Sequence, residues 1–240
     1  MDNLTIIKKR LSRRSYLGTD LSTKQVSALE SHIEHWNEIS GLTSFFLANG
    51  SSAFSKISKS YGMFKGVKSL IVLKGLKSDK DLKEKVGYYG ELLILEATKM
   101  NLGTCWVGGT FDKESNIFQV EADEELICVI TVGNVLMEES FKERILRKTI
   151  RRNTKEVGEL CEAIGEMPDW LASGMEGVQL APSTKNTQKV LFLYKTGVLR
   201  ASIPDTYKFD YVDLGIAKLH FELCAGGHFE LGNGGRYFRG

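Results

Sequence analysis

The chain is short of several features that mark common protein classes. Its 240 residues include only three prolines, four cysteines and four histidines, and 32 basic residues nearly balance 30 acidic ones for a formal net charge of +2. So small a net charge gives no general attraction to nucleic acid or to anionic membrane surfaces. We therefore expect neither a nucleic acid nor a membrane as a partner.

The cysteines and histidines show no disulfide or metal-binding pattern. Cys105, Cys128, Cys161 and Cys224 are widely spaced, with no Cys-x-x-Cys pair and mostly apolar neighbours. Disulfide frameworks and zinc sites have closer and more regular spacing. The histidines also lack metal-ligand spacing with a suitable third ligand. This pattern predicts reduced core cysteines and no metal site.

Long uncharged apolar runs are missing. The N-terminus has no apolar signal core, and the most apolar helical segment, near residues 89–102, carries Glu91, Glu96 and Lys99. These charges argue against a secretory signal or a membrane-spanning helix. The chain does contain 42% apolar residues, enough to bury a core in one large domain or two small ones. We expect a globular, cytoplasmic protein.

Hydrophobic periodicity predicts both helices and strands along the chain. Helices are predicted near residues 4–11, 26–36, 79–101, 154–164, 169–179 and 211–225, with Ser22 as an N-cap of the second and Gly103 as the stop of the third. Strands are predicted at residues 43–48, 69–74, 126–132, 190–194 and 198–203, the last two joined by a hairpin at Thr196-Gly197. This mixed order predicts an α+β fold, with a mixed, mainly antiparallel sheet flanked by helices.

Two basic clusters could bind a phosphate. In "SRRSY", Arg13, Arg14 and Ser15 place two guanidiniums and a hydroxyl close together, an arrangement that can bind a phosphate by several hydrogen bonds. The alternative is a basic helix end that complements the helix dipole. The second cluster, "RILRKTIRRNTKEV", contains Arg151 and Arg152. It could reach a phosphate from the end of a sheet, or be a solvated charged face.

Two further segments could approach a ligand. In "NLGTCWVGGTF", Gly108 and Gly109 follow an apolar strand, where glycines allow close approach to a flat ligand or simply form a tight turn. The segment "LAPSTKNTQKVLF" places several short polar side chains between two apolar runs, and a helix-to-strand turn is the alternative. The polar candidates, with the proline before them, are Pro182, Ser183, Thr184 and Asn186.

Two glycine-rich segments do not match nucleotide-binding motifs. "GMFKGVKS" has the wrong spacing for a P-loop, and its strand follows the loop instead of preceding it. "GNGG", at residues 232–235, lacks the dinucleotide fingerprint and reads as a glycine hairpin. Neither segment supports ATP or an adenine dinucleotide as a bound cofactor.

In combination, these clusters resemble the FMN-dependent nitroreductase family. "SRRSY" is similar to the family's N-terminal Arg-x-Ser-x-Arg, and "ELLILEATKMNLGTCWVGGTFDK" to its long central helix and the following glycine-bearing strand. "RKTIRRNTKEV" resembles its basic phosphate segment, and "APSTKNTQ" its Pro-Ser-x-x-Asn-x-Gln flavin loop. The resemblance implies an FMN-dependent oxidoreductase. By analogy, NADH or NADPH would reduce the flavin, and a nitroaromatic, quinone or related acceptor would take the electrons in a ping-pong cycle.

The resemblance also assigns roles to residues. Arg13, Arg14 and Ser15, helped by Arg151 or Arg152, would bind the FMN phosphate, although Leu17 stands where the family often has a second basic residue. Gly108 and Gly109 would face the flavin edge near N5. The isoalloxazine or ribityl would be lined by Pro182, Ser183, Thr184 and Asn186. No catalytic side chain is predicted, because the flavin itself carries the hydride chemistry.

The order of the motifs departs from the family pattern. In ordinary members the flavin loop comes before the central helix and reaches the partner's flavin across a homodimer, whereas here it comes late. We therefore predict a single-chain pseudo-dimer, in which residues 1–157 and a shortened second half, residues 158–240, form one intertwined domain with one flavin site. A monomer is expected, and a homodimer is not excluded.

Two alternative functions stay open. One is a flavin-binding carrier or sensor without turnover, and the other is a flavin-free protein that binds an anionic partner through residues 142–155.

Overall fold

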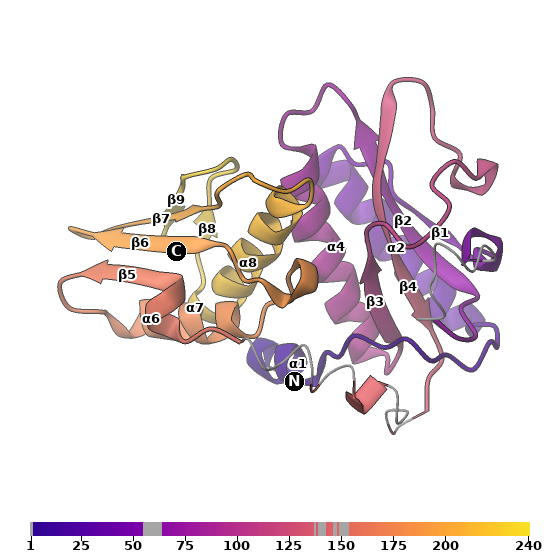
Figure 1. Ribbon diagram of the computed structural model, residues 1–240, viewed down its shortest axis with the longest axis horizontal. Coiled ribbons are helices and arrows are strands. Elements are labelled where there is room, and N and C mark those ends of the chain that lie inside the picture. The colour runs from indigo at the N-terminus through magenta and orange to yellow at the C-terminus, as the bar shows by residue number, and fades with distance from the viewer. Residues whose placement is uncertain (1, 55–63, 137, 139–142, 146–147, 149–153) are drawn as a thin grey trace. The chain divides into compact units, whose positions relative to one another are not determined.

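The computed structural model describes residues 2–54, 64–136, 138, 143–145, 148 and 154–240 (Figure 1). The chain divides into two compact units, each built from several segments. Unit 1 comprises Met1–Lys9, Lys83–Glu91 and Lys148–Gly240, and unit 2 comprises Arg10–Leu82 and Leu92–Arg147. Within the described residues, no helix combines the length and apolar character that a membrane crossing requires. The division of the chain into half-repeats at residue 157 stays a prediction.

Unit 2 is built around an antiparallel sheet with the strand order β1-β2-β4-β3. The strands are β1 (Phe45–Leu47), β2 (Ser69–Leu76), β4 (Glu124–Gly133) and β3 (Gly103–Val107). The two inner strands are buried almost throughout, with Val72 paired to Val129. Helix α2 (Thr23–Ser40) lies along this sheet, and short 3-10 turns, η1 (Ser51–Phe54) and η2 (Asn116–Phe118), complete the unit (Figure 1).

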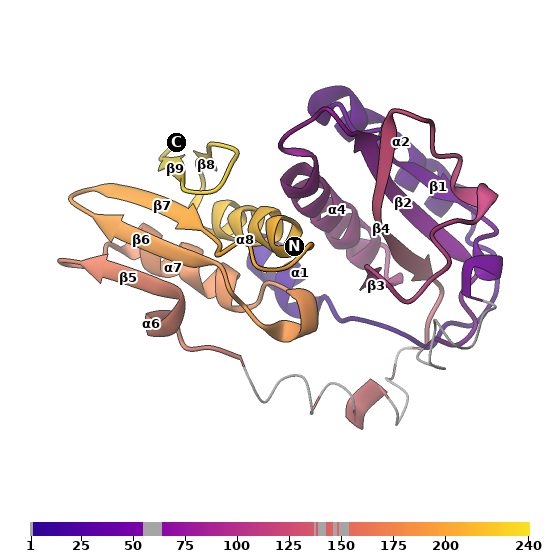
Figure 2. The same cartoon turned by 45° about the horizontal axis from the view of Figure 1, so that its top comes forward.

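Unit 1 contains a second sheet, with the strand order β5-β6-β7-β9-β8. The strands are β5 (Cys161–Ile164), β6 (Leu191–Lys195), β7 (Val198–Ser202), β8 (His228–Phe229) and β9 (Gly235–Phe238). All neighbours pair antiparallel except β5 and β6, which are parallel. Helices α7 (Asp169–Gln179) and α8 (Asp210–Ala225) pack against each other on one side of this sheet (Figure 2). Helices α1 (Asn3–Lys9) and α6 (Val157–Leu160) and the turn η3 (Thr184–Asn186) complete the unit.

Helix α8 is the buried centre of unit 1. Eleven of its sixteen residues are buried, and its Phe221 joins a core cluster with Phe192 of β6. Helix α4 (Leu82–Lys99) contributes its residues 83–91 to this unit and its residues 92–99 to unit 2. Two glycines allow close contact between the α4 and α8 backbones. A Cβ added to Gly87 would lie 2.0 Å from the Val212 carbonyl oxygen, and one added to Gly215 would lie 2.0 Å from that of Glu84.

The predicted α+β class and the antiparallel character of the β structure are confirmed. Ser22 caps α2 in a reciprocal capping box with Gln25, as its position before the apolar periodicity suggests. Residues 169–179 form α7 as predicted. The β6–β7 hairpin turns through Thr196 and Gly197, both with positive φ, the conformation that tight hairpins favour.

Two local predictions are wrong. Residues 154–164 do not form one helix, because α6 ends at Leu160 and β5 begins at Cys161, which pairs with Phe192 of β6 and joins the hydrophobic core. Gly103 is not the stop of α4, which ends at Lys99 and is followed by Asn101 with φ 60°. Gly103 instead begins β3, where an added Cβ would lie 2.3 Å from Val135 Cγ1.

The helix contact in unit 1 gives a first prediction. We expect Gly215→Ala to lower the free energy of unfolding by roughly 1–3 kcal/mol or more, because the added methyl overlaps the backbone oxygen of Glu84. The control is Gly158→Ala in α6, where an added Cβ meets nothing within 4 Å. Urea denaturation followed by circular dichroism measures both. Equal denaturation midpoints for the two variants would contradict close packing at this helix crossing.

Candidate functional site

The polar loop between α7 and β6 is tightly folded and strained. Residue Ala181 precedes Pro182, and a residue before proline avoids the helical region, so α7 ends at Gln179. Three non-glycine residues of the loop then have positive φ, namely Lys185 (54°), Asn186 (56°) and Gln188 (43°). Such conformations cost free energy and persist only where the surroundings hold them. The loop is therefore held by contacts outside itself.

Gln188 fixes the end of the loop. Its backbone N–H donates to Ser183 Oγ (2.9 Å), which closes the loop on itself. Its buried side chain accepts from the Lys155 backbone N–H (2.9 Å) and donates to the Gln179 carbonyl oxygen (3.1 Å). Gln188 thus connects the loop to the end of α7 and to the segment before α6.

Asp213 of α8 fixes the start of the loop. The Thr184 backbone N–H donates to both carboxylate oxygens of Asp213, each at 3.0 Å, and the Thr184 hydroxyl donates to Oδ1 at 3.2 Å. Burial, together with the charge of nearby Asp210, raises the pKa of Asp213 to about 7, although the bonds from Thr184 and the charge of Lys189 act the other way. This carboxyl group therefore changes ionisation near neutral pH.

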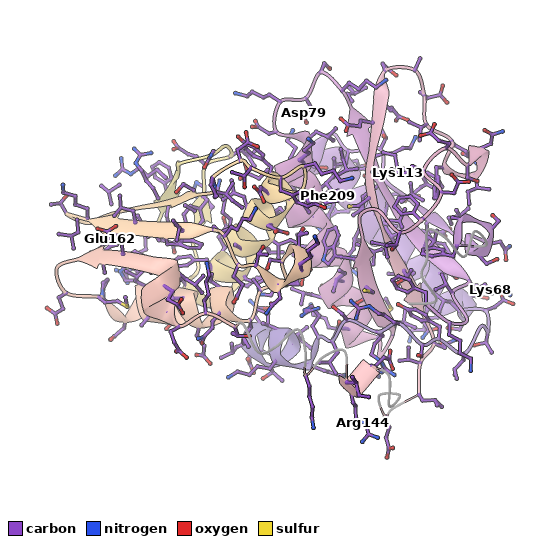
Figure 3. The ribbon with its side chains drawn as sticks, in the orientation of Figure 1. Lys68, Asp79, Lys113, Arg144, Glu162 and Phe209 are labelled. Atoms are coloured by element: carbon purple, nitrogen blue, oxygen red, sulfur yellow. The ribbon has the colours of Figure 1, made fainter. Side chains whose placement is uncertain are left out.

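The neighbouring Asp210 serves a different segment. Its carboxylate accepts from the backbone N–H groups of Thr206 (2.8 Å) and Tyr207 (2.9 Å) and from Lys189 Nζ (3.1 Å). Burial alone would raise the pKa of Asp210, but these bonds leave it below its usual value. Phe209, which Figure 3 labels, immediately precedes it at the start of α8. Two carboxylates on one helix therefore hold two different loops.

A small pocket lies beside the Asp213 contact. Its lining is mostly apolar, with three polar side chains from the loop and α8. The residues are Leu160, Val178, Ala181, Pro182, Ser183, Gln188, Val190, Asp213 and Ala217. Pro182 and Ser183, two of the predicted ligand residues, therefore line a recess of unit 1.

In unit 2, the predicted arginine segment runs in extended form past the start of β3. The Arg13 N–H donates to the Thr104 carbonyl oxygen (2.8 Å), the Lys65 N–H donates to Arg14 O (2.9 Å), and the Tyr16 N–H donates to Lys65 O (2.8 Å). These backbone bonds fix the positions of the side chains between them.

Glu143 occupies an anion site made by this segment. Its Oε1 accepts from the backbone N–H groups of Arg14 (2.6 Å) and Ser15 (3.0 Å) and from Arg13 Nε (3.3 Å). Successive backbone N–H groups that converge on one oxygen form an anion-binding nest. Glu143 is itself buried, whereas the next residue, Arg144, is exposed (Figure 3).

The two arginines differ in their surroundings. Arg13 Nη2 also donates hydrogen bonds to the carbonyl oxygens of Leu136 (3.0 Å) and Glu138 (3.3 Å), and its side chain is buried. Arg14 is partly exposed, and its buried Nε has no hydrogen-bond partner within the part of the chain that is described. The Arg13 side chain is therefore bound within the protein, whereas Arg14 Nε is a buried donor without a partner among the described residues.

The remaining candidates are two glycines and two arginines. Gly108 and Gly109 directly follow β3, and an added Cβ on Gly109 would meet nothing within 4 Å. Neither crowding nor a left-handed φ therefore accounts for glycine at position 109. Arg151 and Arg152 lie outside the described residues.

The structure gathers the candidates into two groups and adds residues that the sequence did not reveal. Arg13, Arg14 and Ser15 lie together in unit 2, and the residues from Pro182 to Asn186 lie together in unit 1. Glu143 and Asp213 were not predicted, because each binds a residue far away in sequence. Gln188 was visible as the last residue of "PSTKNTQ", but nothing in the sequence indicated its role in holding the loop.

Comparisons with known proteins agree with this fold. The family model described as "Putative TM nitroreductase" matches residues 3–225. The crystal structure of a putative nitroreductase from Thermotoga maritima is 22% identical, with a TM-score of 0.65, over 99% of this chain and 92% of that chain. A nitroreductase with bound FMN from Bacteroides fragilis is 14% identical, with a TM-score of 0.45, over 58% of this chain and 94% of that chain. No curated protein sequence matches significantly.

The Glu143 contact gives a second prediction. We expect Glu143→Ala to lower the free energy of unfolding by roughly 3–5 kcal/mol, because it leaves the buried Arg13 guanidinium without its carboxylate. Glu138→Ala is the control, since the side chain of Glu138 is exposed and only its backbone oxygen binds Arg13. Thermal and urea denaturation compare the two variants. A loss no larger than that of the control would show that Glu143 does not hold the segment.

Proposed function

The chain belongs to the putative TM nitroreductase family, whose model matches residues 3–225, and we propose on that basis that it is an FMN-dependent oxidoreductase. The proposed electron donor is NADH or NADPH, and the acceptor is a nitroaromatic, a quinone or a related small molecule. The family match over nearly the whole chain is the observation that carries the proposal. The four motifs that resemble FMN-dependent nitroreductases support the same reading.

The arginine segment of unit 2 fits a terminal phosphate. Arg14 has a buried Nε without a hydrogen-bond partner in the described structure, and buried donors are normally satisfied. A phosphate oxygen would satisfy it with a charge-assisted bond. Arg13, which already binds Glu143, would act by holding the segment in place. We therefore assign phosphate contact to Arg14, with Ser15 beside it.

Gly109 and the polar loop each have features that suit the flat part of a flavin. The open space at the Cβ position of Gly109 would let a planar ring approach the backbone closely. The strained loop with Pro182, Ser183, Thr184 and Asn186 provides several hydrogen-bonding groups in one place. Backbone strain of this kind is typical of ligand-binding segments. We assign these residues to the flavin ring and its ribityl chain.

Bound FMN would supply the hydride chemistry, and the side chains of this chain would bind and orient it. Arg14 would anchor the phosphate end, and the loop would present hydrogen-bonding groups to the ring. Neither Arg14 nor the loop is assigned a role as a catalytic acid or base, since both would act by positioning the flavin. A loop that is already held by contacts within the protein loses less entropy when a ligand binds.

A binding experiment tests the phosphate assignment. Because FMN and riboflavin differ only in the phosphate, we expect wild type to bind FMN more tightly than riboflavin. Arg14→Ala should weaken FMN binding by about ten- to a hundredfold, the loss of one charge-assisted hydrogen bond, and leave riboflavin binding unchanged. Quenching of flavin fluorescence gives both affinities.

Arg144→Ala is the matched control, because this exposed arginine lies next to Glu143 (Figure 3). Its FMN affinity should equal that of wild type. If wild type binds neither flavin, the proposed function is wrong. If Arg14→Ala weakens FMN and riboflavin equally, Arg14 does not contact the phosphate.

A further inference from the structure

We propose that Asp213 is a positioning residue that sets the conformation of the loop Pro182–Gln188. The inference rests on the proposed function, because it concerns the same flavin-binding loop. It adds a residue that no sequence motif marks. Asp213 would not touch the flavin and would act through Thr184, which lies in the loop.

The geometry of the contact supports this role. Asp213 accepts three hydrogen bonds, all from Thr184, and both of its oxygens receive the backbone N–H. Thr184 is the first residue of η3, directly before the strained residues Lys185 and Asn186. A fixed backbone at Thr184 therefore determines where the left-handed turn begins. Gln188 holds the other end of the loop.

A different explanation would be that Asp213 only complements the helix dipole. It lies in the first turn of α8, where a negative charge is favourable. That effect requires neither burial nor a partner from another segment. Asp213 is only 3% exposed and binds a backbone N–H group 29 residues earlier in the chain. Asp210, in the same turn of the same helix, binds Thr206 and Tyr207 instead.

The loop contact depends on the ionisation of Asp213. The charged groups that act on it are Asp210 of the same helix and Lys189, which precedes β6. An ionised carboxylate accepts all three bonds, whereas a protonated one directs an O–H toward donors and loses acceptor capacity. Because burial raises the pKa of Asp213 to about 7, the folded state loses stability as the pH rises from about 4 to about 7. In the folded protein the carboxylate that holds Thr184 forms around pH 7, so flavin affinity should rise between about pH 6 and pH 8.

Riboflavin is the suitable probe, since it lacks the phosphate group that itself titrates near pH 6. We expect the affinity of wild type for riboflavin to rise several-fold between pH 6 and pH 8. Asp213→Asn should bind several-fold more weakly at pH 8 and show no such rise. Asp210→Asn is the matched control. It should still show a rise, but at lower pH, because removal of the Asp210 charge lowers the pKa of Asp213.

Hydrogen exchange of the Thr184 amide gives a second readout, which needs no flavin. The amide should be protected at pH 8 in wild type and lose protection in Asp213→Asn. If Asp213→Asn does not fold, Thr184→Val removes only the hydroxyl bond to Asp213, so the rise of its riboflavin affinity with pH should be smaller than that of wild type. Wild-type protein that binds no flavin would overturn the proposed function and this role with it. Wild type that binds riboflavin, with Asp213→Asn unchanged in affinity and pH profile, would overturn the positioning role alone.

Discussion

Burial of ionisable side chains on α8 is the constraint on which unit 1 depends. Asp210, Asp213, Lys218 and His220 are all buried on this helix, and an unpaired buried charge costs several kcal/mol. Each side chain therefore has partners in another segment, and each holds that segment in place. Asp210 binds Thr206, Tyr207 and Lys189, and Asp213 binds Thr184. Lys218 binds Glu84 and the carbonyl oxygens of Glu230 and Gly232. His220 binds Glu91 and the carbonyl oxygen of Gly177.

Helix packing and the proposed site are connected through these contacts. Close backbone approach at Gly87 and Gly215 brings α4 against α8 and leaves no room for side chains between them. The same helix carries Asp213, whose carboxylate binds the backbone of Thr184 in the loop. A loop held before its ligand arrives loses less entropy on binding. In unit 2, too, a buried carboxylate holds a loop segment, because Glu143 accepts hydrogen bonds from the backbone N–H groups of Arg14 and Ser15.

Much of the local structure could be predicted from the sequence, because it depends on neighbouring residues. The Ser22 cap and the Thr196-Gly197 turn follow from side-chain and backbone preferences within a few positions. The residues 161–164 were predicted as helix and form β5, because their conformation is set by pairing with β6. The motif "PSTKNTQ" identified the loop, but not the carboxylate that holds it. "DYVDLG" reads as an ordinary helix start, and only the fold brings its second aspartate to Thr184.

Reduction of bound FMN by a nicotinamide nucleotide is the decisive test of the proposed oxidoreductase function. The protein, saturated with FMN and freed of oxygen, would be mixed with NADH or NADPH while the visible absorbance of oxidised flavin is recorded. We expect the absorbance to be lost on mixing and to return when a quinone or nitroaromatic acceptor is added. Flavin that binds but stays oxidised with both nucleotides would contradict the oxidoreductase function and leave a protein that only binds FMN.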